Sequence, residues 1–232
     1  MRFFRAFIVL TTLPALLAAA APDKMAPIGS YLMERKIEIA LARSAAPAAI
    51  SGHAKVMVLT RNGYVAAVNG DNGFTCFVER AWANPFDMVP FWNPRVRAPT
   101  CLNPEASRSI WPYTSKRTDL ALAGATKEQI MARLTAAIAD GSLPTPQPGA
   151  MSYMMSKRQY LNDEGKAWVP HVMFYAPKVD GAKNGADWGA DMPRSPVVYD
   201  PDHHLVPEPW ALFMIPVSHW SDGSPAPPYS GM

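Results

Sequence analysis

The distribution of proline constrains the fold of this chain more than any other feature. Proline supplies 24 of the 232 residues, twice its usual frequency of about 5%. Each proline fixes φ and lacks an amide donor, so it interrupts helices and central strands. Six prolines lie between Pro85 and Pro112, and nine lie between Pro193 and Pro228. We therefore predict a chain that is not mostly helical and that carries two long, ordered, proline-rich loops.

The rest of the composition indicates a globular α+β domain. Hydrophobic residues make up 49% of the chain, which excludes a disordered protein. The length fits a single domain. The order of apolar segments predicts a mainly antiparallel sheet of about five or six strands, packed against two helices and covered by long loops rich in proline and tryptophan.

Residues 1–20 have the layout of a secretory signal peptide. Arg2 and Arg5 precede a short apolar run, and small residues follow it. The run is shorter than the ~20 residues that a membrane-spanning helix needs. We therefore predict a mature domain at residues 21–232 that is periplasmic or secreted, with no stable membrane anchor after cleavage. An uncleaved anchor is the alternative.

The charge of the mature chain argues against a nucleic-acid partner. The full chain has 22 basic and 19 acidic residues. Loss of Arg2 and Arg5 with the signal peptide leaves 22 − 2 = 20 basic residues, so the mature chain is nearly neutral. It also lacks a Lys/Arg run and an RNA-binding aromatic motif.

Export also determines how the two cysteines are interpreted. Cys76 and Cys101 are the only cysteines, and an oxidising compartment favours a disulfide between them. A free catalytic thiol is the alternative.

Two segments have the periodicity of helices. The first begins near Ser30 and ends before Pro47; its predicted buried stripe excludes Glu38 and consists of Met33, Ile37, Ala40 and Leu41. The second starts at Thr126, which forms a capping box with Gln129. Gly141 can adopt the left-handed backbone conformation that ends this helix. Its predicted buried stripe consists of Ile130, Leu134, Ala137 and Ile138.

Apolar runs predict strands in two regions. Residues 55–60, 64–68 and 74–80 predict a three-stranded meander, in which Asn62-Gly63 forms the first hairpin turn. Glu79 in this region is interpreted as a solvated edge carboxylate without a role. The second region comprises runs at residues 150–156, 168–176 and 210–219, after which the tail from Ser221 is expected to fray.

The segment 81–114 is predicted to be an ordered loop joined to the third strand through Cys101. It contains three tryptophans, Trp82, Trp92 and Trp111. These aromatic side chains either cover the core or line a ligand-binding groove, and both interpretations remain open.

Histidine is concentrated near the C-terminus. His171 opens one predicted strand and His219 closes the next, so antiparallel pairing brings them to one edge of the sheet. The loop between these strands carries Asp200, Asp202, His203 and His204. Imidazole and carboxylate ligands suit zinc or copper. The alternative is a solvated polar loop with no metal.

Methionine offers a second argument for copper, because thioethers bind Cu(I). Met173 and Met214 lie on predicted neighbouring strands, close to a cluster at residues 151–155. Core packing is the interpretation that we favour for these methionines.

The chain contains none of the short motifs that mark common catalytic sites, such as G-x-S-x-G, H-E-x-x-H, GxxxxGK[ST] or C-x-x-C. The leading hypothesis is therefore a non-catalytic binding or structural module without a cofactor. The alternative is a metal-dependent enzyme or a zinc- or copper-binding protein that uses the His/Asp loop.

One resemblance covers most of the mature chain. The stretches VLTRNGYVAAVNGDNGFTCFVERAW, FWNPRVRAPTC, MSYMMSKRQYL and PHVMFY are similar to exported bacterial proteins of unknown function. The resemblance implies export and a single domain, and it implies no activity, substrate or site.

Overall fold

The computed structural model describes residues 24–88, 91–165, 167–177, 197–199 and 205–228. Its helical elements are η1 (Ile28–Ser30), α1 (Arg35–Arg43), α2 (Ala48–Ser51), η2 (Ala81–Ala83), α3 (Pro104–Ser109), α4 (Trp111–Leu122) and α5 (Lys127–Ala139). Its strands are β1 (Lys55–Thr60), β2 (Gly63–Val68), β3 (Thr75–Glu79), β4 (Ala98–Leu102), β5 (Met151–Met154), β6 (His171–Pro177), β7 (Val197–Tyr199) and β8 (Trp210–Pro216). The predicted signal peptide lies outside the described residues.

The strands form one mixed sheet in the order β2-β1-β3-β4-β5-β6-β8-β7. The α+β class is therefore confirmed, but the predicted counts are wrong. The described part of the chain has eight strands rather than five or six, and five α-helices rather than two. Most neighbouring strands are antiparallel, as predicted; β1 and β3 are parallel.

The β1–β3 pairing contradicts the predicted meander. After β2, the chain passes the beginning of β1, where Asp71 N donates to His53 O and Lys55 N donates to Phe74 O. It then enters β3 on the opposite side of β1 from β2. The connection thus crosses the beginning of β1 instead of folding back beside β2. The predicted hairpin is present, but Gly63, with φ 101°, pairs with Thr60 at the start of β2 rather than filling the turn.

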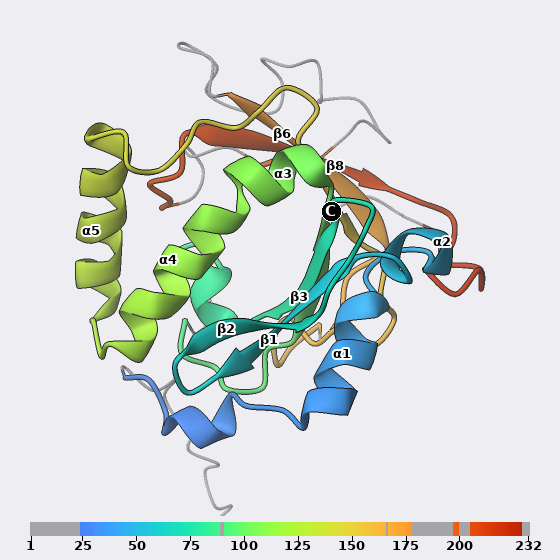
Figure 1. Cartoon of the computed structure of the whole chain (residues 1–232), viewed down its shortest axis with the longest axis horizontal. Coiled ribbons are helices and arrows are strands. Elements are labelled where there is room, and N and C mark those ends of the chain that lie inside the picture. Colours follow the sequence, from blue (N-terminus) through green and yellow to red (C-terminus); the bar gives the residue numbers. More distant parts are fainter. Residues whose placement is uncertain (1–23, 89–90, 166, 178–196, 200–204, 229–232) are drawn as a thin grey trace, which may run out of the picture.

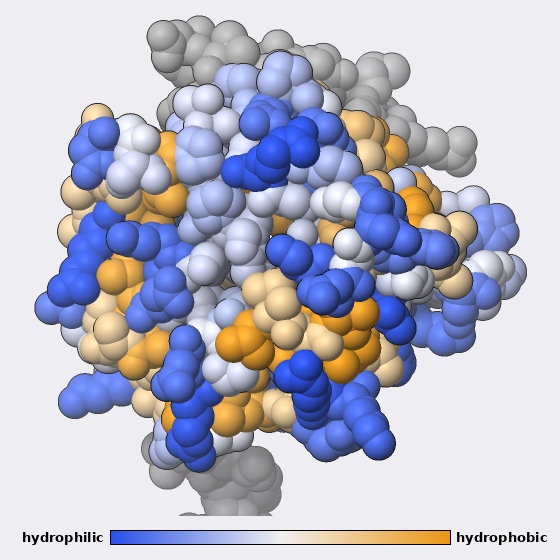
Figure 2. Space-filling view, in the orientation of Figure 1, coloured by the Kyte–Doolittle hydropathy of each residue, from blue (hydrophilic) through white to orange (hydrophobic). Residues whose placement is uncertain are grey.

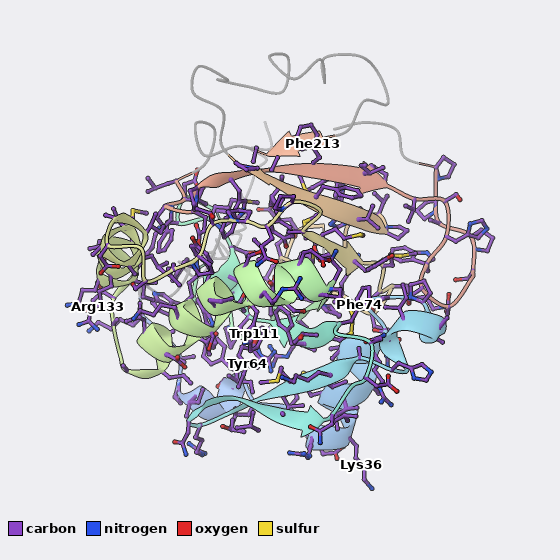
Figure 3. The ribbon with its side chains drawn as sticks, turned by 45° about the horizontal axis from the view of Figure 1, so that its top comes forward. Lys36, Tyr64, Phe74, Trp111, Arg133 and Phe213 are labelled. Carbon is purple, nitrogen blue, oxygen red and sulfur yellow. A yellow bond between two sulfur atoms is a disulfide. The ribbon has the colours of Figure 1, made fainter. Side chains whose placement is uncertain are left out.

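Helices cover both faces of the sheet, with α3, α4 and α5 on one side and α1 and α2 on the other (Figure 1). Alternation along β3 sends Phe77 into the larger cluster, under α3–α5, and Val78 into the smaller cluster, under α1. In the larger cluster, Tyr64 and Trp111 lie together below α4 (Figure 3), with ring centroids 5.3 Å apart.

The predicted disulfide is confirmed and lies on the α1 side of the sheet. Cys76 on β3 and Cys101 on β4 are directly opposite each other in the antiparallel ladder. Both residues are fully buried in the smaller cluster. The disulfide therefore joins two central strands, whereas the sequence predicted a link between the third strand and a loop, and no free cysteine is present.

The predicted orientation of the first helix is wrong. Ile37 on α1 is 56% exposed, whereas Glu38 is fully buried together with Leu41 and Ala42. The helix is thus rotated relative to the predicted stripe, because Glu38 has an ion-pair partner inside the protein. The second predicted helix is confirmed as α5, with the capping box of Thr126 and its end near Gly141, which has φ 76°.

The segment 81–114 is more regular than predicted. It contains β4, α3 and the start of α4, and both helices have proline in their first turn, where no amide donor is needed. At the other end of the chain, the three predicted strands appear as β5, β6 and β8. Beyond them, Ser221 N donates to Met155 O and Ala226 N donates to Ser218 O, so this part of the tail is hydrogen-bonded.

Candidate functional site

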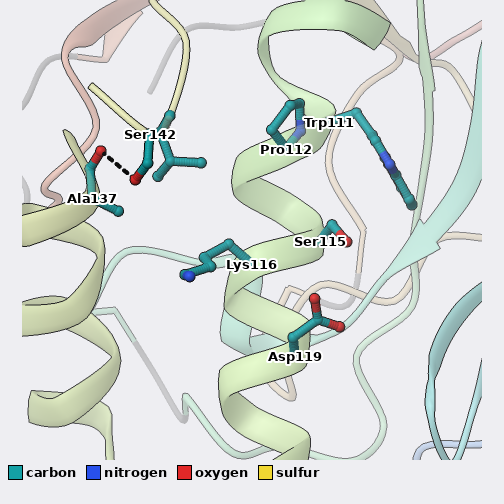
Figure 4. A pocket seen from close by; sticks show the side chains of 8 residues that line it. Trp111, Pro112, Ser115, Lys116, Asp119, Ala137 and Ser142 are labelled. Carbon is teal, nitrogen blue, oxygen red and sulfur yellow. Dashed lines mark hydrogen bonds between the residues drawn. The ribbon is translucent and has the colours of Figure 1, made fainter. Parts of the chain in front are cut away.

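The tryptophans from the segment 81–114 lie mostly in the core. Trp82 and Trp92 are 1% and 4% exposed, and Trp82 Nε1 donates to Thr118 Oγ1. Trp111 borders a pocket beside α4, but its ring packs on Phe77 with centroids 4.8 Å apart. Figure 4 shows Lys116 of this pocket reaching toward α5, whereas Trp111 extends from the other side of α4. These contacts favour the interpretation that the tryptophans cover the core.

A second pocket, the α1–β1 pocket, lies between the start of α1 and the end of β1. Its volume is about 330 Å³. In the same region, Figure 2 shows apolar residues gathered between α1 and the β1–β2 hairpin, with hydrophilic residues around them. The pocket is lined by Leu32, Met33, Arg35, Glu38, Val58, Leu59, Thr60 and Arg61. Apolar walls with a few charged groups are typical of small-molecule sites.

Glu38 is the buried charge of this pocket. Its Oε1 atom lies 2.7 Å from Arg80 Nη2, and both side chains have 0% exposure. The same oxygen accepts a hydrogen bond of 3.2 Å from Leu59 N. Arg80 in turn donates from Nε to Tyr31 O and from Nη1 to Val78 O. Arg80 is therefore fully engaged, and the ion pair is fixed between α1 and β3.

The second carboxylate oxygen, Glu38 Oε2, is buried and accepts no hydrogen bond from the described part of the protein. A buried acceptor without a donor typically costs about 1–3 kcal/mol, and Gln159 Oε1 and Glu208 Oε2 are two further such oxygens among the described residues. Because Glu38 has 0% exposure, Oε2 lies out of reach of a ligand in the α1–β1 pocket.

Two arginines complete the charge of the pocket. Arg35 and Arg61 are both exposed, and Arg35 Nη2 donates to Ala67 O at 3.1 Å. Neither arginine forms an ion pair within the described residues. Both guanidinium groups therefore keep N–H donors that can bind an anion, although Arg35 already uses one on Ala67 O.

The structure confirms the strand pairing behind the predicted metal site, but it places the two described histidines in different surroundings. β6 and β8 are antiparallel with His171 opposite Pro216, so the pairing behind the hypothesis is confirmed. His171 is 3% exposed, and its Nδ1 lies 2.9 Å from Val169 O. Burial lowers its pKa to about 4, so the ring is neutral near pH 7. His219 Nδ1 instead lies 2.9 Å from Ser218 Oγ on the surface.

The other predicted ligands, Asp200, Asp202, His203 and His204, lie outside the described residues. Within the described ranges, no group of three or more His, Cys, Asp or Glu side chains is arranged to hold a metal ion. The zinc or copper hypothesis therefore stays a prediction. The preferred interpretation of the methionines is supported, because Met154, Met173 and Met214 pack in one apolar cluster.

Glu79 differs from the solvated edge carboxylate that the sequence suggested. β3 is an interior strand, and Glu79 lies near Arg117 and Thr100. Burial raises the pKa of Glu79 to about 7, although Arg117 and Thr100 act in the opposite direction. The protonated form is therefore favoured in the folded protein relative to the unfolded chain.

We expect Glu79 to make the protein less stable as pH rises. Because the folded pKa exceeds the unfolded value, the stabilising contribution is complete below about pH 4.5 and is lost as pH rises through 7. Between pH 5 and pH 8, the free energy of unfolding should fall by about 2 kcal/mol relative to that of Glu79→Gln, whose amide does not titrate. Urea unfolding at both pH values measures this difference, and equal pH dependence in the two proteins would contradict it.

Sequence reasoning missed the carboxylate and the arginines of the α1–β1 pocket. Glu38 was placed off the buried stripe, and Arg80, Arg35 and Arg61 were given no role. The available signal was a second stripe of small and apolar residues, Leu41, Ala42 and Ala45, which includes Glu38 at helical spacing.

No described helix has the length and apolar character needed to cross a membrane. Comparisons of the chain with protein-family models, with curated proteins and with solved structures found no match. The resemblance to exported bacterial proteins of unknown function therefore stays a prediction, and the case for a function depends on the geometry of the α1–β1 pocket.

Proposed function

We propose that this chain is an exported, periplasmic or secreted binding module that holds a small ligand in the α1–β1 pocket without transforming it. One observation carries this proposal: the pocket combines apolar walls with two exposed guanidinium groups, those of Arg35 and Arg61, which form no ion pair within the described residues. A ligand with an apolar body and an anionic group would match this combination. The disulfide agrees with an oxidising compartment outside the cytoplasm.

The residues that line the pocket suit binding better than catalysis. They provide one carboxylate and two guanidinium groups, and they include no His, Cys, Lys or Ser side chain. The carboxylate is already paired with Arg80 through Oε1, and arginine does not lose its proton in proteins. The pocket therefore offers recognition groups rather than a nucleophile with an adjacent base.

Titration with anilinonaphthalene sulfonate tests whether the pocket binds ligands. This fluorescent probe combines apolar rings with an anionic group, which match the apolar walls and the two arginines of the pocket. We expect saturable binding at one site, weakened about tenfold in Arg61→Ala. Met33→Glu places a negative charge on the pocket wall and should abolish binding. Arg133→Ala is the matched control, because Arg133 is exposed on α5, away from α1 (Figure 3).

Binding that is equally strong in the wild type, Arg61→Ala and Met33→Glu would overturn the proposal, because the probe would then occupy another surface. Absence of saturable binding in the wild type would also overturn it.

A further inference from the structure

A buried arginine on α4 lies close to two carboxyl groups. Arg117 is 4% exposed, and its Nε and Nη2 atoms lie 2.7 Å and 2.6 Å from Glu208 Oε1. Its Nη1 atom donates to the backbone oxygens of Trp82 and Asn84. Glu79 on β3 lies near the same guanidinium group, which acts to lower the pKa of Glu79. One positive charge therefore serves two groups that can each become negative.

The surroundings of the two carboxyl groups supply little further compensation for a second negative charge. Within the described part of the chain, the other titratable groups near them are tyrosines, namely Tyr64, Tyr113 and Tyr175. Burial raises the pKa of each tyrosine, so all three are neutral near pH 7. If Glu79 and Glu208 were both ionised, this interior site would carry a net negative charge, which is costly away from water.

Glu208 belongs to a segment with few polar attachments, residues 205–209, which leads into β8. Two of these five residues are prolines, which donate no backbone hydrogen bond. The segment is attached to the rest of the fold by the Arg117–Glu208 ion pair and by a hydrogen bond of 2.9 Å from Phe86 N to Leu205 O. Glu208 Oε2 is buried and has no donor among the described residues, so the ion pair depends on Oε1.

Ionisation of Glu79 would bring a second carboxylate into competition for Arg117. We propose that Glu79, Arg117 and Glu208 form a proton-controlled latch. While Glu79 carries a proton, Arg117 holds Glu208 and residues 205–209 against α4. When Glu79 loses this proton to water, the segment detaches more often and Glu79 becomes hydrated. The latch does not involve the α1–β1 pocket, so it is independent of the proposed function.

The latch should respond to pH near neutrality. Burial raises the pKa of Glu79 to about 7 in the closed fold, whereas a hydrated glutamate in the detached state returns to its ordinary value of 4.5. The stabilising contribution of protonated Glu79 is therefore complete below about pH 4.5 and is lost as pH rises through 7. These two pKa values predict that the population of the detached state rises about tenfold between pH 6 and pH 8.

Hydrogen exchange at the Phe86 amide measures the detachment, because this amide donates to Leu205 O. In the mature protein, we expect the protection factor of Phe86, corrected for the intrinsic exchange rate, to fall about tenfold from pH 6 to pH 8. Glu79→Gln keeps the shape of the side chain but does not titrate, so it should remove this fall.

Two further variants test whether the competition for Arg117 is the cause. In Glu208→Gln, Arg117 is released to pair with Glu79, so the fall in protection should shrink to less than about twofold. Glu164→Gln is the matched control, because Glu164 is an exposed carboxylate that is not part of the latch. It should keep the pH dependence of the wild type.

Three results would overturn the latch. The first is an equal pH dependence of Phe86 protection in the wild type and in Glu79→Gln. The second is a fall of wild-type size in Glu208→Gln. The third concerns the wild type alone: Phe86 must exchange faster than the slowest core amides, which report global unfolding. If Phe86 exchanged only as slowly as those amides, the segment would not detach by itself.

Discussion

Replacing Arg80 by methionine is expected to lower the free energy of unfolding by about 3–5 kcal/mol. The substitution leaves Glu38 with 0% exposure and without the guanidinium group that now lies 2.7 Å from its Oε1 atom. An uncompensated carboxylate in the interior is far more costly than a missing hydrogen bond on the surface. Guanidinium unfolding followed by tryptophan fluorescence measures the loss.

Two further variants separate this effect from lost packing. The double variant Glu38→Leu with Arg80→Met removes both charges, so it should recover most of the stability lost in Arg80→Met. Arg95→Met removes an arginine from an ion pair with Asp163 in which both partners are largely exposed, and it should change stability little. The burial of charge would not be the cause if the double variant were as unstable as the single variant.

This ion pair also explains why the orientation of α1 could not be predicted from hydrophobicity. Ile37 lies on a regular apolar stripe in the sequence, yet it is 56% exposed. Glu38 takes the buried position because Arg80, which is distant in sequence, reaches it from the end of β3. Periodicity describes one helix at a time, whereas a buried charge depends on a partner that only the tertiary structure places.

Local signals were more informative where one short segment determines the structure. The capping box at Thr126 and the left-handed glycine at Gly141 need no distant partner, and the apolar runs of β5, β6 and β8 can be recognised within single segments. The structure contains all of them. The predicted meander is wrong because it depended on how strands from different segments pair. A turn sequence such as Asn69–Gly73 indicates a change of direction, but it does not determine on which side of β1 the next strand pairs.

In the candidate site too, features of single residues were predictable, whereas features that depend on distant partners were not. Sequence reasoning could identify aromatic and histidine residues by their chemistry, and it directed attention to Trp111 and His171. It could not find the α1–β1 pocket, since Arg35 and Glu38 on α1 meet Arg61 at the end of β1 only in the tertiary structure.

Removing the disulfide is expected to have an effect of similar size to that of breaking the ion pair. Cys76 and Cys101 are separated by 25 residues in the sequence. On the chain-entropy model, opening a loop of this length lowers the free energy of unfolding by about 3–4 kcal/mol, because the unfolded chain gains conformations. Guanidinium unfolding of Cys76→Ala with Cys101→Ala, compared with the oxidised wild type, measures this loss.

The reduced wild type distinguishes the crosslink from the packing of the sulfur atoms. Both cysteines are fully buried in the cluster beneath α1, so the double alanine variant also creates a small cavity. Reduction keeps the sulfur atoms and removes only the bond. If the crosslink dominates, the reduced protein should lose nearly as much stability as the double variant, with two alkylated thiols found by mass spectrometry after unfolding. Retention of stability after complete reduction would show that β3 and β4 are held by their ladder and by the core alone. The pairing of Cys76 opposite Cys101 within that ladder would then be a consequence of the fold rather than a main source of its stability.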